Sequence, residues 1–133
     1  MRPNNNLKIT KAMIKGLGSP PIPAWLWKVV TEGITPFPKY IALVYAYLLS
    51  NGSLQEGELP SLATKCEELV INFWRCFDSL EELGLVTKQC VQCPEDLDNL
   101  DEPIIYRYFP LYNYDGSSRF EGGANIYDTF DAE

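Results

Sequence analysis

Asn72 and Arg75 lie one helical turn apart in the segment VINFWRCFDSLEELG, and both have side chains that can read DNA bases. An amide forms paired hydrogen bonds with adenine, and a guanidinium does so with guanine. The helical period predicts that the face carrying them also presents residues suited to protein contact: Ile71, Trp74, Asp78 and Glu82. Because Asp78 and Glu82 would approach phosphates of like charge, this face gives conflicting indications about its partner.

The first part of the chain is basic. Residues 1–31 contain five Lys or Arg residues and no acidic one. If LKITKAMIKGL is helical, Lys8, Lys11 and Lys15 share one face and can contact a phosphate backbone. Gly and Pro interrupt the segment, so we expect residues 1–22 to form a basic flexible arm; the alternative is a solvated tail without a partner.

The rest of the chain is acidic. Between residues 56 and 102 there are twelve carboxylates against three basic residues, and the whole chain has a formal charge of −7. Glu95, Asp96 and Asp98 fall in the loop between two predicted strands. This charge opposes binding to double-stranded DNA and favours a basic partner, so we expect a protein from the nucleic-acid machinery or a second copy of this chain.

Several kinds of chemistry are not indicated. The sequence has no histidine, the commonest general base and a common metal ligand, and it has no glycine-rich phosphate loop. Cys90 and Cys93 have the spacing of half a zinc site, but a second close pair is missing, and the alternative is a pair of thiols able to oxidise. We therefore predict a protein that is not an enzyme and has no cofactor and no metal.

The apolar pattern predicts the elements that would position these residues. A short helix at 23–33 precedes a buried central helix that follows Thr35 as a cap, and SLQ is a possible edge strand. Two further helices are expected at 59–65 and 69–83, followed by two strands at 85–93 and 103–112. This is a mainly α fold with a small β-hairpin, in the order of a winged helix, spanning residues 23–112. The acidic segment 113–133 is expected to be disordered.

A second arrangement stays open for the middle of the chain. Apolar residues keep an unbroken helical period through Leu62, Cys66, Leu69, Phe73, Phe77 and Leu80. Thr64 and Glu67 could also form a capping box. One long helix would then replace the two shorter ones, and no helix-turn-helix would exist.

The segment LPSLATKCEELVINFWRCFDSLEELGLV resembles the winged helix-turn-helix at the amino terminus of phage and plasmid replication initiators and of the primosomal protein DnaD. The likeness covers about residues 22–112 and depends on three features. These are Pro60 and Ser61 before Leu62 and Ala63, the apolar positions Phe73, Phe77 and Leu80, and the ending LEELGLV. The sequence departs from the pattern at CEEL, where a glycine and a small capping residue are usual.

Two functions follow from the resemblance and the charge. In the first, the chain takes part in replication initiation or transcription regulation and binds DNA weakly through Lys8, Lys11, Lys15, Asn72 and Arg75. In the second, it is an acidic protein-interaction module, or a nucleic-acid mimic, acting on the replication, transcription or nuclease machinery. The sequence shows no secretory signal and no membrane-spanning segment, so we expect a cytoplasmic protein without a membrane partner.

Overall fold

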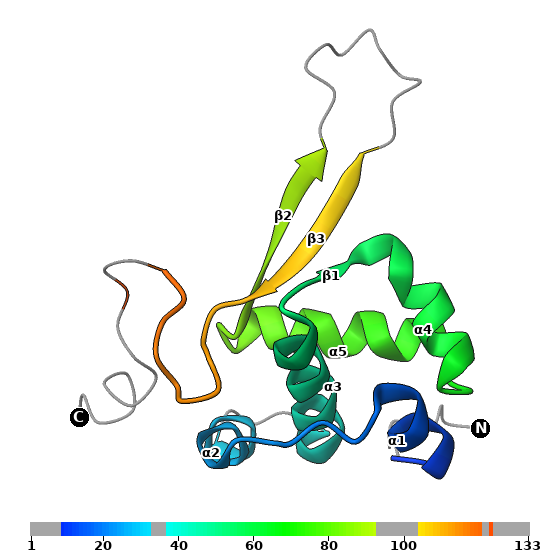
Figure 1. Ribbon diagram of the computed structural model, residues 1–133, viewed down its shortest axis with the longest axis horizontal. Coiled ribbons are helices and arrows are strands. Elements are labelled where there is room, and N and C mark those ends of the chain that lie inside the picture. The colour runs from blue at the N-terminus through cyan, green and yellow to red at the C-terminus, as the bar shows by residue number, and fades with distance from the viewer. Residues whose placement is uncertain (1–8, 33–36, 93–103, 121–122, 124–133) are drawn as a thin grey trace, which may run out of the picture.

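A computed structural model describes residues 9–32, 37–92, 104–120 and 123. These residues form a mainly α fold with a small three-stranded antiparallel sheet toward the C-terminal end (Figure 1). The helices are α1 (Lys11–Leu17), α2 (Ala24–Glu32), α3 (Pro38–Asn51), α4 (Leu59–Lys65) and α5 (Val70–Glu82), with the 3-10 turn η1 (Glu56–Glu58) before α4. The strands are β1 (Leu54–Gln55), β2 (Val86–Gln92) and β3 (Ile105–Pro110). The order of elements is consistent with a winged-helix-like topology.

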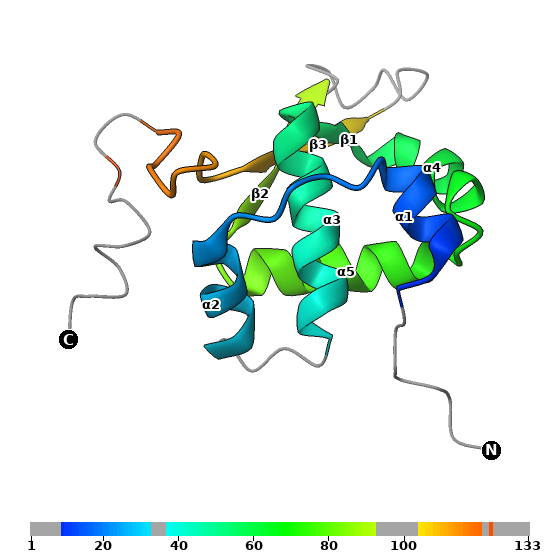
Figure 2. The ribbon, with the colours of Figure 1, turned by 60° about the horizontal axis from the view of Figure 1, so that its bottom comes forward.

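Helix α3 forms the centre of the core because it is apolar on nearly every face. Its side chains are buried from Tyr40 to Ala46, and α1 and α2 flank it on opposite sides (Figure 2). The helix begins at Pro38, with Phe37 at the N-cap position. Thr35, the predicted cap, lies outside the described residues, and the observed N-cap corrects that prediction.

The chain breaks between α4 and α5, so the alternative of one long helix is wrong. Glu67 adopts a left-handed conformation with φ of 52°, which a continuous α-helix cannot accommodate. The backbone N–H of Glu68 donates to the carbonyl of Ala63 at 2.8 Å and closes the end of α4. The proposed box between Thr64 and Glu67 does not form, because the Thr64 hydroxyl donates to the carbonyl of Pro60.

The sheet has the strand order β1-β3-β2, and this confirms both the predicted hairpin and the short edge strand. Leu54 pairs with Tyr108, and Lys88 pairs with Tyr108 from the other side. Tyr108 is buried and stacks on Phe77 of α5, with ring centroids 4.4 Å apart. This ring pair attaches the hairpin to α5.

The expected flexible arm is wrong for residues 9–20, because α1 packs into the core. Thr10 caps α1 by accepting the N–H of Met13, whose side chain is buried. Gly16 lies so close to the α4–α5 turn that a Cβ atom there would be 2.6 Å from the sulfur of Cys66. Two small residues thus allow a close approach that neither composition nor charge indicates. Lys8 and the rest of residues 1–8 lie outside the described residues.

The segment after β3 also makes contacts beyond the predicted domain end at residue 112. The indole N–H of Trp25 donates to the carbonyl of Tyr114 at 2.7 Å, and Tyr112 forms a β-bridge with Ser118. Residues 113–120 therefore pack on the body of the protein, and most of the predicted disordered tail lies outside the described residues. No helix in the described ranges has both the length and the apolar character needed to cross a membrane.

Candidate functional site

The two faces of α5 separate as the sequence predicts. Four side chains on the inner face are fully buried: Phe73, Cys76, Phe77 and Leu80. On the outer face, Ile71 is 49% exposed and Trp74 is 42% exposed, and Asp78 and Glu82 are exposed beside them. The structure thus brings together the four residues predicted for protein contact.

Asn72 and Arg75 lie on one side of this outer face and are used within the chain. The amide nitrogen of Asn72 donates to a carboxylate oxygen of Glu68 at 2.8 Å. The guanidinium of Arg75 lies over the ring of Phe37, 5.7 Å from its centroid, which is a cation–π distance. Both side chains that could read bases therefore have partners in the folded chain.

Glu68 organises this side of the helix, a role that its sequence position did not indicate. Besides Asn72, its carboxylate accepts the backbone N–H of Leu69 at 2.8 Å and the hydroxyl of Tyr40 at 3.1 Å. Burial raises the pKa of Tyr40, and the nearby Glu68 charge adds to that rise. The only local signal for this role is a carboxylate directly before the helix start, where an oxygen can accept orphan N–H groups.

Trp74 lies on the other side of α5 and lines a groove of about 250 Å³. The groove runs between α5, the start of α4 and the outer part of β3. Its other lining residues are Gln55, Glu56, Gly57, Pro60, Ile104, Ile105 and Tyr106. Ile104 is 56% exposed, so apolar surface extends from the helix onto the hairpin. The sequence predicted the exposure of Trp74 but gave no indication of the groove, because its walls come from distant segments.

The surroundings of the groove are predominantly acidic. Lys88 forms an ion pair with Glu56 and also lies 4.9 Å from the ring centroid of Tyr106. The hydrogen bond with Glu56, followed by the charges of Glu56 and Glu81, raises the pKa of Lys88. Burial raises the pKa of Tyr108, and the charges of Glu56, Glu81 and Asp78 raise it further. Around Lys88 and Tyr108, the carboxylates of Glu56, Glu81 and Asp78 therefore outnumber the one ammonium group, which favours additional cations in this region.

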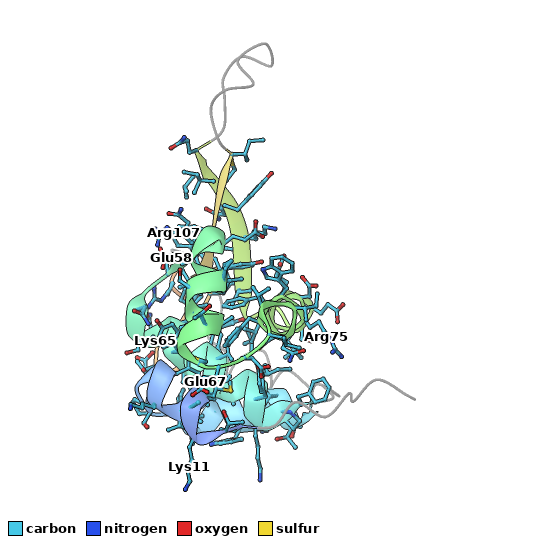
Figure 3. All side chains as sticks on the ribbon, turned by 90° about the vertical axis from the view of Figure 1, so that its right-hand side faces the viewer. Lys11, Glu58, Lys65, Glu67, Arg75 and Arg107 are labelled. Carbon is cyan, nitrogen blue, oxygen red and sulfur yellow. The ribbon has the colours of Figure 1, made fainter. Side chains whose placement is uncertain are left out.

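The structure does not bring the predicted basic residues together on the α5 surface. Lys11 and Lys15 are exposed on α1, and Lys11 points away from the body in a different direction from Arg75 (Figure 3). Lys8 lies outside the described residues, as do Glu95, Asp96 and Asp98 of the predicted acidic loop. In the described part of the chain, Lys11 and Lys15 on α1 therefore lie apart from Asn72 and Arg75 on α5.

The cysteines differ in their environments. Cys66 and Cys76 are buried free thiols, and burial raises the pKa of both. Cys90 is disulfide-bonded, whereas Cys93 lies outside the described residues. A disulfide sulfur is not the thiolate that zinc requires, so this state of Cys90 does not fit the half zinc site considered from the sequence.

Comparisons with protein-family models, with curated proteins and with solved structures give no match to this chain.

Proposed function

We propose that this chain is a non-catalytic winged-helix protein that binds another protein through the Trp74 side of α5. One observation carries the proposal: Asn72 and Arg75, the residues suited to reading bases, contact Glu68 and Phe37 of the same chain, whereas Ile71 and Trp74 are exposed near carboxylates. Exposed aromatic side chains at the centre of a surface are common anchors of protein interfaces. In the described part of the chain, Lys88 beside this surface is paired with Glu56 and Arg75 lies over Phe37, whereas phosphate binding favours several cations without such partners.

The nature of the partner is proposed from the winged-helix resemblance. Winged helices of replication initiators and DnaD associate this fold with replication or transcription, although a fold alone does not determine function. We therefore propose a protein component of the nucleic-acid machinery as the partner. An inhibitor that imitates nucleic acid is a special case, in which the carboxylates would occupy a basic cleft of that component.

DNA binding through α1 is a second candidate function. Lys11 and Lys15 are exposed one turn apart on a helix capped by Thr10, so they can contact neighbouring phosphates. Any such binding should weaken steeply as salt increases, because phosphate contacts release counterions. The overall charge of −7 opposes it.

A direct experiment selects peptides from a random display library on the immobilised full chain. We expect enrichment over a blank surface, and soluble wild-type protein should compete for the enriched peptides. Trp74→Ala should compete at least about tenfold less well, since anchor residues carry much of an interface's free energy. Trp27→Ala is the matched control, because Trp27 is 38% exposed on α2, and it should compete like the wild type.

Absence of enrichment, or equal competition by both tryptophan variants, would contradict the proposal. A parallel measurement uses fluorescence anisotropy with random duplex and single-stranded DNA at low and moderate salt. The proposal predicts no binding. Salt-sensitive binding that disappears in a Lys11→Glu, Lys15→Glu double variant would instead support the second candidate.

A further inference from the structure

The groove beside Trp74 lies along an edge of the sheet where β3 has no strand partner in the described chain and where η1 contacts β3 next to the end of β1. Strand β1 pairs with β3 only at Tyr108 and Arg107, because the chain turns into η1 after Gln55. Strand β3 continues outward through Tyr106 and Ile105, where β2 is its partner on one side. On the other side, no strand of the described chain pairs with these two residues, and the hairpin extends beyond the end of β1 (Figure 1).

An open strand edge can pair with the backbone of another segment. Here the edge residues Ile105 and Tyr106 also line the groove, together with Gln55 at the end of β1. A segment entering the groove would therefore continue the line of β1 beside β3. The groove volume of about 250 Å³ is small, since ligand pockets commonly occupy ~300–1,000 Å³. It suits one or two side chains better than a cofactor.

We propose that this groove binds an extended, basic segment of the partner protein. The segment adds as a short strand beside Ile105 and Tyr106 and places an apolar side chain against Trp74 and Ile104. This inference rests on the proposed function, and it specifies where the partner binds and which chemistry it presents.

Charge complementarity determines the kind of segment. Two cations border this region, and each lies next to a carboxylate: Lys88 pairs with Glu56, and Arg107, which donates to the groove residue Gln55, is 3.9 Å from Glu58. The charges of Glu81 and Asp78 add to the negative side. Lys or Arg residues flanking the apolar anchor would meet this negative potential, whereas an acidic segment or a nucleic acid would be repelled.

Two variants can test whether the apolar side chain of the partner binds in the groove or elsewhere on the hairpin. Ile104 and Val91 are both exposed aliphatic residues near the outer end of the hairpin, at 56% and 50%. Ile104 lines the groove, and Val91 is not among its lining residues. Ile104→Ala removes part of the anchor contact, and Val91→Ala is its matched control.

The test uses the peptides enriched on the full chain in the display experiment. We expect them to alternate apolar and basic residues. The strongest peptide should bind about tenfold more weakly to Ile104→Ala than to Val91→Ala. In the ¹⁵N-labelled full chain, bound peptide should shift the amide signals of Ile105 and Tyr106 and slow the hydrogen exchange of the edge-facing amide.

Three results would overturn the inference while leaving the proposed function standing. These are enrichment of acidic peptides, equal affinity for Ile104→Ala and Val91→Ala, and binding that leaves the Ile105 and Tyr106 amides unchanged. The last result would indicate a helical or otherwise unpaired segment on α5. Failure to enrich any peptide would contradict the proposed function itself, so the two failures are distinguishable.

Discussion

The two sides of α5 use their side chains in opposite ways. On one side, Asn72 binds Glu68 and Arg75 lies over Phe37, so the polar groups are satisfied within the chain. On the other side, Trp74 borders a groove whose neighbouring carboxylates outnumber its one ammonium group. The difference indicates that the shape of a helix-turn-helix does not decide its partner. We propose that the availability and the charge of its outer side chains decide it.

We expect the largest loss of stability from replacing Phe77, because its ring attaches the hairpin to the Trp74 side of α5. It is fully buried and stacks on Tyr108 at 4.4 Å. Phe77→Ala should lower the free energy of unfolding by about 3–5 kcal/mol, through lost burial and the cavity left behind. Urea denaturation measures the change. Ile71→Ala, on the exposed face of the same helix, should change it by less than ~1 kcal/mol. Comparable losses in the two variants would argue against this attachment.

We expect the next largest loss of stability from replacing Glu68, which lies on the other side of α5. Glu68→Ala leaves the hydroxyl of Tyr40, the N–H of Leu69 and the amide of Asn72 without their acceptor. Unfolding free energy should fall by about 2 kcal/mol, because unpaired polar groups that are partly buried are costly. Glu67→Gly is the matched control and should raise stability by about 1 kcal/mol, because it relieves the left-handed conformation of Glu67. Equal losses from both variants would remove the special role of Glu68.

We expect the smallest loss of stability from breaking the ion pair between Lys88 and Glu56 beside the groove. Glu56→Gln should lower stability by less than ~1 kcal/mol at neutral pH, because the pair with Lys88 is partly exposed. Glu56 raises the pKa of Lys88, so the pair's contribution is complete below the ordinary lysine pKa of ~10.4 and is lost as pH rises through the raised value. Urea denaturation of both proteins should therefore show a difference that shrinks in strongly alkaline solution. A difference independent of pH would contradict this assignment.

Local pattern predicted much of the fold but little of the site. The spacing of Phe73, Phe77 and Leu80 separated the inner face of α5 from Trp74, because that distinction depends only on helical period. One long helix across Glu67 stayed open as an alternative, since the apolar period continues through the break and the hydrogen bond from Tyr40 to Glu68 joins residues far apart in the sequence. A tertiary contact of this kind has no signature in the local sequence.

Contacts between segments that are far apart in the sequence account for the remaining differences between the predicted and the observed structure. Basic charge and the interrupting Gly and Pro residues suggested an arm at residues 1–22, but Gly16 fits closely against Cys66, fifty residues away, and α1 packs on the body. The groove likewise combines Pro60, Trp74 and Ile104 from three separate segments. Such contacts depend on how elements pack, so composition and periodicity could not indicate them.

We propose that Trp74, and not the side of α5 that carries Asn72 and Arg75, meets the partner. The indole N–H signals of the three tryptophans test it in one NMR titration of the full chain, with a library-selected peptide and then with duplex DNA. Trp25 is buried and bonded to Tyr114, and Trp27 lies on α2, so both act as internal controls. We expect the peptide to change the chemical shift of the Trp74 indole alone, and DNA to change none of the three. A shift of Trp74 by DNA, or a peptide that moves Trp27 instead, would contradict it.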